Sequence, residues 1–541
     1  MTQEQQLHAN DLVVCTVVFN KPRFIEYQYE CLKKYITIPF RFIVFDNSFG
    51  DDEIPRHCSY VGATYVRVPP QVNNNNDNYP SYRAGASLNY ALQYIYHNMG
   101  HRGIVMVNDS DLFLTDTFNP VEQLGQDDII GISQSQLVGG IYYTNQFLIM
   151  NFDTLPNFND ISFLPDVGID CGGLLLNYFH HNPQVKHRGC RMVHSGDLNP
   201  TNINNVPDMY KDYFVKEMNI IKAGDYANRS FSEIVNNVFI HLRAGSNWYG
   251  FPESEQFARE DNLFTFLSNR LIDWKLPDDP QNKYVISFSL YGNNPKYTHN
   301  AIMNVIFADK VYKGWKCRFY VDHTVPECII HKLSSYSHVE IVKIEGAKDA
   351  PTADKMLWRF YPASDETVAA MISRDCDSWL SFREACSTKK WIESEKQFHI
   401  IRDHCYHSQK IMGGMWGVKR GKVSNMKELC QEYVQHNTYD QGFLANSIYP
   451  NIIDSVMVHM GDDQRMMGGA PSHGYFPDGG IPFECYPKIL EYIPTIDMER
   501  ANDVNVFQCA HCGKNHTFFI GEMMNNLHHP TKQFLKKMGL E

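Results

Sequence analysis

The sequence predicts an α/β protein with two Rossmann-like domains, each built on a mostly parallel sheet, and a small C-terminal extension. Three observations predict this fold. The chain has 541 residues, which is too long for one hydrophobic core. Short apolar runs alternate with segments of helical spacing, as expected when helices connect parallel strands. This alternation occurs twice, and each time it ends in an Asp-x-Asp motif.

The first series leads into Asp109-Ser110-Asp111. Its first apolar run is continuous, which is typical of a strand buried on both faces. Apolar residues at Leu88, Leu92 and Ile95 share one face of a predicted helix. The predicted strands are 12–19, 41–46, 65–68 and 104–107, and the predicted helices are 24–35 and 87–99.

A second series in the same order begins near Lys283 and leads into Asp375-Cys376-Asp377. We therefore predict domains over 1–255 and 283–495, a helical linker over 256–282, and a tail over 496–541. One large sheet is the alternative. The predicted strands are 284–290, 317–322, 339–344 and 368–373, and the predicted helices are 297–312 and 354–360.

Composition excludes several classes of protein. The chain is 43% hydrophobic and 13% aromatic, which excludes disorder throughout. Its formal net charge of -12 argues against a large nucleic-acid-binding surface. The first residues are polar and lack the pattern of a signal peptide, and no apolar stretch reaches the ~18 residues of a membrane span. We expect a cytoplasmic protein whose 14 cysteines are mostly reduced.

The acidic motifs suggest divalent metal sites. Asp109 and Asp111 follow an apolar strand, and ligands of open parallel sheets bind at that end. Two carboxylates one residue apart provide the oxygen ligands that Mg²⁺ and Mn²⁺ prefer. Such an ion neutralises a diphosphate leaving group. A solvated turn or a helix cap is the alternative interpretation of either motif.

The surroundings of the first motif resemble GT-A fold glycosyltransferases. The matching segments are TVVFN at 16–20, DNS at 46–48, SYRAGASLNYAL at 81–92 and VNDSD at 107–111. The whole set is similar to predicted sugar transferases of bacteria and large DNA viruses. It covers roughly 10–250 and 283–490, at the level of motifs. The resemblance implies that a nucleoside diphosphate sugar contacts Asn20, Asp46, Arg83, Asn89 and Asn108.

The same resemblance implies further roles in the first half. His241 would be a third metal ligand beside Asp109 and Asp111. The segment DVGIDCGG at 166–173 is similar to an acceptor loop, in which Asp170, or else Asp166, would be the general base. The alternatives are a buried structural histidine and a helix cap.

In the second half the resemblance implies a second site. Asp375, Asp377 and His459 would bind metal, and Asp440 would contact the donor sugar or act as a base. Separately, Ser381 to Glu384 (SFRE) reads as a capping box at the start of a helix. The remaining donor contacts would be Arg359, Arg374, Gly413, Gly414 and Trp416, with Trp416 as a stacking face.

The tail contains a possible structural zinc site. Cys509 and Cys512 have the spacing of half such a site, and His516 with His528 or His529 would complete four ligands. A turn with reduced cysteines and surface histidines is the alternative.

The function that accounts for most of these features is glycosyl transfer. We predict a bifunctional enzyme that uses Mn²⁺ or Mg²⁺ and moves sugars from nucleoside diphosphate sugars to hydroxyls of a growing glycan or glycoprotein. One alternative is a single active domain beside a non-catalytic carbohydrate-binding domain. Others are a DNA-base sugar transferase and a nucleotidyl- or phosphotransferase. A P-loop motif, G-x-x-x-x-G-K-[ST], is absent from the sequence.

Overall fold

The structure of the chain is a computed structural model. It divides into two compact units, residues 1–271 and 272–541. Among the residues described, no helix has the length and apolar character to cross a membrane, and no disulfide joins any of the ten cysteines. The structure describes residues 12–48, 53–73, 80–136, 140–166, 169–194, 206–221, 232–243, 245, 253–345, 351–402, 409–434, 440–460, 481–482, 506–508 and 515–517.

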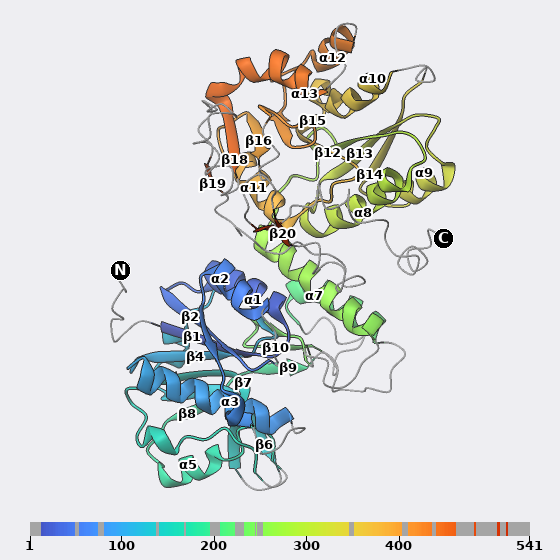
Figure 1. Ribbon diagram of the computed structural model, residues 1–541. Helices are drawn as coiled ribbons and strands as arrows, with labels where there is room; N and C mark the ends of the chain where they lie inside the picture. Colours follow the sequence, from blue (N-terminus) through green and yellow to red (C-terminus); the bar gives the residue numbers. More distant parts are fainter. Residues whose placement is uncertain are drawn as a thin grey trace. The chain divides into compact units, whose positions relative to one another are not determined.

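A seven-stranded sheet forms the centre of the first unit, in the order β3-β2-β1-β4-β7-β6-β8. Its first four strands are parallel, and β7 is antiparallel to both neighbours. Helices α1 and α2 lie on one face and α3 on the other (Figure 1). The strands are β1 (Leu12–Val18), β2 (Phe40–Asp46), β3 (Thr64–Arg67), β4 (Ile104–Asn108), β6 (Ile129–Gln136), β7 (Gly140–Asn151) and β8 (His187–Gly189).

The helices of this unit cover the sheet because alternate strand residues point to opposite faces. Val13, Cys15 and Phe45 join the core cluster under α3, whereas Phe42 contacts Tyr29 of α1. The long helix α7 packs on α1 through Phe264 and therefore belongs to the first unit. The helices are α1 (Pro22–Tyr35), α2 (Glu53–Val61), α3 (Pro80–Gln93), α4 (Pro120–Leu124), α5 (Leu175–His181), α6 (Asp208–Ile220) and α7 (Glu253–Ile272).

A second, smaller sheet in the first unit has four antiparallel strands, in the order β5-β11-β10-β9. Each strand has only three residues, so the sequence shows no period that would predict them. The strand β5 starts directly after Asp111, which places this sheet beside the acidic motif. The strands are β5 (Leu112–Leu114), β9 (Met192–His194), β10 (Glu233–Val235) and β11 (Phe239–His241).

The second unit has an eight-stranded central sheet, in the order β14-β13-β12-β15-β17-β16-β18-β19. Here too the first four strands are parallel, and the sixth strand in chain order, β17, is antiparallel to β15 and β16. The strands are β12 (Lys283–Leu290), β13 (Lys316–Val321), β14 (Val339–Lys343), β15 (Val368–Arg374), β16 (Phe398–Arg402), β17 (Trp416–Lys419), β18 (Val456–Met460) and β19 (Ile481–Pro482).

Helices again cover both faces of this sheet. Helices α8, α9 and α11 lie on one face, and α10, α12 and α13 on the other (Figure 1). Ser381 caps α11 and accepts a hydrogen bond from the Glu384 backbone N–H at 3.2 Å, as the capping box predicts. The helices are α8 (Pro295–Val311), α9 (Glu327–Ser334), α10 (Thr352–Leu357), α11 (Phe382–Ile392), α12 (Met426–Val434) and α13 (Asp440–Phe443).

The two central sheets have the same topology once β5 is assigned to the small sheet. In each, the strands run third, second, first, fourth, sixth, fifth, seventh, with only the sixth reversed. The predicted α/β class with two mostly parallel sheets is confirmed, and the single-sheet alternative is wrong. The tail contributes the short pair β20 (Val506–Gln508) and β21 (Asn515–Thr517).

Candidate metal centre and active site

The first acidic motif lies at the carboxyl end of β4, in the middle of the first central sheet. Asp109 follows the last strand residue, and Asp111 precedes β5. Between them the Ser110 backbone N–H donates to Asp109 Oδ1 at 2.8 Å. A tight turn of this kind directs both carboxylates to the same edge of the sheet, where parallel α/β sheets bind ligands.

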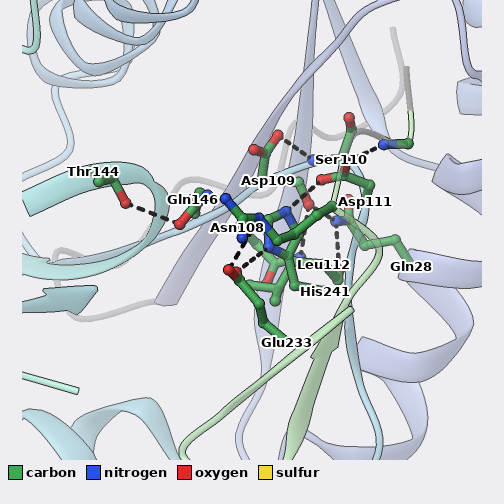
Figure 2. Close-up of polar contacts among 12 residues, drawn as sticks. Gln28, Asn108, Asp109, Ser110, Asp111, Leu112, Thr144, Gln146, Glu233 and His241 are labelled. Atoms are coloured by element: carbon green, nitrogen blue, oxygen red, sulfur yellow. Dashed lines mark hydrogen bonds and ion pairs between the residues drawn. The ribbon is translucent and has the colours of Figure 1, made fainter. Parts of the chain in front are cut away.

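The small antiparallel sheet brings His241 to this turn. In its register His241 pairs with Leu112 on one side and with Glu233 on the other. Since Leu112 directly follows Asp111, this register places the imidazole beside that carboxylate, and His241 Nε2 lies 3.1 Å from Asp111 Oδ1 (Figure 2). Ligand atoms of Asp109, Asp111 and His241 all lie within 4.8 Å of one another.

Glu233 holds the histidine from behind. Its Oε2 lies 2.9 Å from His241 Nδ1, and its Oε1 lies 3.1 Å from Arg243 Nε. The carboxylate is buried, with 2% of its side chain exposed. A carboxylate bound to one ring nitrogen keeps the other nitrogen directed at the metal position, as in many metal sites with histidine ligands.

Buried polar groups fix the turn itself. Gln28 of α1 donates to the carbonyl oxygens of Asp109 and Leu112 at 2.6 and 3.1 Å. Asn108 donates to the Leu112 carbonyl at 2.9 Å. The Gly245 backbone N–H donates to Asp111 Oδ2 at 3.0 Å, and a Cβ at Gly245 would stand 2.8 Å from that oxygen. A glycine is therefore needed for this close approach.

At its two aspartates the cluster has more negative than positive charge. Burial, together with the negative charge of Asp111, raises the pKa of Asp109 to about 7. Burial alone would lower the pKa of His241, but Asp111 and Glu233 outweigh it and raise this pKa to about 10. Among the residues described, no lysine or arginine pairs with Asp109 or Asp111. A divalent cation would supply the missing charge, and the donor set of two carboxylates and one imidazole fits Mn²⁺ or Mg²⁺.

Three of the predicted donor contacts lie near the carboxyl ends of β1 and β2 or in the first turn of α3. Asp46 is fully buried, pairs with Arg67, and accepts from the Ser48 N–H at 2.9 Å. The Asn20 N–H donates to Ser48 Oγ at 2.8 Å. The Arg83 guanidinium carbon lies 4.7 Å from the centre of the Phe19 ring.

Two other predicted donor contacts hold the protein together instead. Asn108 is buried in the turn described above. Asn89 accepts from the Phe163 N–H at 2.8 Å and donates to Ser162 Oγ at 3.3 Å. It therefore ties α3 to the segment that leads into the predicted acceptor loop.

Both candidate bases in that loop are exposed. Asp170 Oδ1 accepts from the Cys171 N–H at 2.7 Å, and its carbonyl closes a turn with Gly173, so it caps a turn rather than α5. Asp166 forms an isolated bridge with Ile169. Burial raises the pKa of the Cys171 thiol, and the charges of Asp170 and Asp109 add to that rise. The carboxylates of Asp170 and Asp109 are therefore both close enough to the Cys171 sulfur to affect its pKa.

The second acidic motif has a different environment. Arg359 pairs with Asp375 and, at 2.5 Å, with Asp440. Lys296, at the start of α8, lies 2.9 Å from Asp377 Oδ2. Gly414 approaches the motif closely, since a Cβ there would stand 2.6 Å from Asp375 Cγ. Gly413 approaches Asp440 and Arg359 in the same way.

The structure does not bring His459 to this motif. His459 lies on β18, which is separated from β15 by β17 and β16. At about 4.8 Å per strand it stands about 14 Å from the strand that carries the acidic residues. Its Nδ1 lies 2.8 Å from His399 Nε2 in the core. Within the described part of the second unit, no three His, Cys, Asp or Glu side chains form a metal-sized group.

Two further predictions for the second half are corrected. Trp416 is 2% exposed and packs edge-on against Phe360 at 5.3 Å, so its ring is part of the core instead of a stacking face. Arg374 is buried and lies 3.1 Å from Glu384 Oε2, and it donates to the Gly414 carbonyl at 3.0 Å. Its guanidinium is therefore paired with groups of the protein itself, in place of a donor phosphate.

Glu233, Gln28 and Lys296 also belong to these sites, although the sequence pattern does not indicate them. Glu233 lies in a three-residue strand, and only its pairing with His241 reveals its role. The zinc prediction stays untested, because Cys509, Cys512 and His528 lie outside the described residues. His516 falls in β21, where only the backbone is described.

No known protein family matches this sequence, and no curated protein matches it. Solved structures with some likeness include the glycosyltransferase GlyE of Streptococcus pneumoniae TIGR4, with 12% identity over 62% of this chain and 80% of that chain, at a TM-score of 0.27. The mannosyltransferase PcManGT of Pyrobaculum calidifontis, in complex with GDP-Man and Mn²⁺, has 13% identity over 33% and 54% of the two chains, at 0.24. Glucosyl-3-phosphoglycerate synthase of Mycobacterium tuberculosis has 17% identity over 33% and 69%, at 0.23. These likenesses are remote, since every TM-score is below 0.5.

Proposed function

We propose that the first unit is a metal-dependent glycosyltransferase that moves a sugar from a nucleoside diphosphate sugar to a hydroxyl of a glycan or glycoprotein. One observation carries this proposal. Asp109 and Asp111 lie with His241 at the ligand-binding edge of a Rossmann-like sheet, and no described lysine or arginine neutralises them. Paired carboxylates short of positive charge suit a divalent ion that binds phosphate oxygens.

The residues of the cluster have separate tasks in this proposal. Asp109, Asp111 and His241 would hold Mn²⁺ or Mg²⁺, and the bound ion would supply positive charge to the diphosphate leaving group. Glu233 keeps His241 Nε2 directed at the ion. Arg83 of α3, which lies over the Phe19 ring next to the end of β1, pairs with a phosphate of the donor. The exposed Asp170, or else Asp166, takes the proton from the acceptor hydroxyl.

The experiment is a panel of sugar nucleotides incubated with Mn²⁺, with release of nucleoside diphosphate as the measurement. We expect wild-type protein to turn over at least one donor, and Asp111→Asn to lower that rate by about 100-fold or more, since the ion supplies several kcal/mol of stabilisation. Asp116→Asn is the matched control, because Asp116 is half-exposed and lies 3.9 Å from Arg270, outside the cluster. Wild-type turnover in Asp111→Asn, or no turnover of any donor by wild type, would contradict the proposal.

A second candidate concerns the other unit. Its matching topology supports a second sugar-nucleotide site, and hence a bifunctional enzyme. The ion pairs on Asp375 and Asp377 favour instead one active transferase beside a unit that binds carbohydrate without catalysis. Asp377→Asn in the same panel separates the two. Loss of one donor in this variant only would support two transfers.

A further inference from the structure

We propose that two cations of the protein, Lys296 and Arg359, occupy the place of the divalent ion at the second acidic motif, so that only the first of the two Asp-x-Asp motifs binds metal. This inference rests on the proposed function only for the first of the two sites. It departs from the expectation that each Asp-x-Asp motif holds an ion.

The first step is the difference in charge between the motifs. Asp109 and Asp111 have His241 as their described basic neighbour. At the second motif, Asp377 pairs with Lys296 at 2.9 Å and Asp375 pairs with Arg359. Each carboxylate of the second motif therefore already has a full positive charge on it. A metal ion there would have to displace these cations or sit beside them.

The second step is that several groups hold Arg359 in place. Only 8% of its side chain is exposed, and its guanidinium bridges Asp375 and the buried Asp440. Its backbone N–H donates to Ser289 Oγ at 3.0 Å, which fixes its position against β12. Gly413 packs against the same guanidinium. To leave Asp375, Arg359 would abandon Asp440 as well, and a buried carboxylate without a partner is costly.

The third step is the missing nitrogen ligand. In the first unit β5 starts directly after Asp111 and recruits β11 with His241. After Asp377 the chain instead enters α11, and the described part of the second unit contains no small antiparallel sheet next to the motif. The predicted third ligand, His459, lies in the core against His399. The donor set of the second motif thus lacks the member that completes the first.

The test counts metal ions on the full chain without any sugar nucleotide. Protein freed of metal with a chelator is titrated with Mn²⁺, and free Mn²⁺ is followed by its electron paramagnetic resonance signal. We expect one site per chain in wild type, one in Asp377→Asn, and none in Asp111→Asn. These two variants are matched, because each removes the second acid of its motif. We also expect no site in His241→Gln, which removes a ligand of the first site that lies on a different strand, β11. Circular dichroism checks that each variant is folded.

Two sites per chain, one of them lost in Asp377→Asn, would overturn the inference and leave the proposed function of the first unit intact. No bound Mn²⁺ in wild type would overturn both. Lys296→Met supplies a further arm, in which we expect a second, weaker Mn²⁺ site that disappears in Lys296→Met/Asp377→Asn. A folded Lys296→Met protein that still binds one ion would overturn the exclusion of metal by Lys296.

Discussion

Replacing Glu233 by Gln tests whether the residue behind His241 controls metal binding. In the native protein both oxygens of Glu233 are in use, one toward His241 Nδ1 at 2.9 Å and one toward Arg243 Nε at 3.1 Å. Glutamine has the same shape but only one acceptor. If the glutamine oxygen faces His241, its NH₂ group faces Arg243 Nε, which is also a donor. If the amide is turned round, its NH₂ group faces the N–H of His241 Nδ1, again one donor against another.

Two estimates of the loss agree. A hydrogen bond between charged groups contributes about 1.5–3 kcal/mol. Removal of the carboxylate behind a ligating histidine weakens metal affinity by about 10- to 100-fold, which is about 1.4–2.7 kcal/mol. We therefore expect Glu233→Gln to raise the Kd for Mn²⁺ by 10- to 100-fold on these grounds, with the sugar-transfer rate at subsaturating Mn²⁺ falling in parallel.

The assay is isothermal titration of metal-free protein with Mn²⁺, together with the thermal midpoint of each variant. Glu26→Gln is the matched control, because Glu26 is a buried carboxylate 2.6 Å from His57 Nδ1, between α1 and α2. It undergoes the same chemical change in the same unit, and we expect it to lower the midpoint without changing the Kd. If Glu233→Gln binds Mn²⁺ as wild type does, the orienting role of this carboxylate is refuted.

Four further changes probe other parts of the structure. Gly245→Ala places a methyl group 2.8 Å from Asp111 Oδ2, so we expect a loss of about 1–3 kcal/mol of stability and weaker Mn²⁺ binding, by thermal unfolding and titration. Trp416→Ala empties a core position, and urea unfolding should show a loss of about 3–5 kcal/mol in the second unit, with Trp416→Phe retaining most of it. Ser381→Ala removes the cap of α11 and should cost about 1 kcal/mol in the same assay. Burial and a neighbouring histidine hold the pKa of His399 well below 6.5. As the pH falls, His399 is therefore protonated in the unfolded chain before it is protonated in the folded protein, and the free energy of unfolding falls below about pH 6.5 by up to ~1.4 kcal/mol per pH unit. His399→Leu should reduce this pH dependence between pH 7.5 and 5.5.

The strands and helices with a clear period could be predicted from the sequence. The predicted strands 104–107 and 368–373 correspond to β4 and β15 within a residue or two. These strands are buried on both faces, so their apolar runs are continuous. The three-residue strands β5, β10 and β11 are too short to show a period, and so the small sheet that completes the first site was not foreseen.

The order of motifs along the chain was a weaker guide to the second site. His241 and His459 both follow an acidic motif along the chain. His241 lies in the small antiparallel sheet of its unit, whereas His459 lies in the central sheet of the other unit. His459 lies on the seventh strand of its central sheet, in the position of β8 in the first unit. Strand order in space decides which side chains meet, and sequence order does not reveal it. The position of Trp416 also depends on strand order, because β17 lies between β15 and β16 and the Trp416 side chain is buried there.

The two units therefore share a fold and differ in chemistry at one point of the chain. After Asp111 the chain forms a short strand that recruits a histidine, and the cluster keeps an excess of negative charge. After Asp377 the chain forms a helix, and Lys296 from α8 takes up the charge. A motif of two acids does not by itself specify a metal site, because its charge can be met by an ion from solution or by a cation from the fold. At the second motif those cations are Lys296 and Arg359, and both come from segments that precede the motif along the chain.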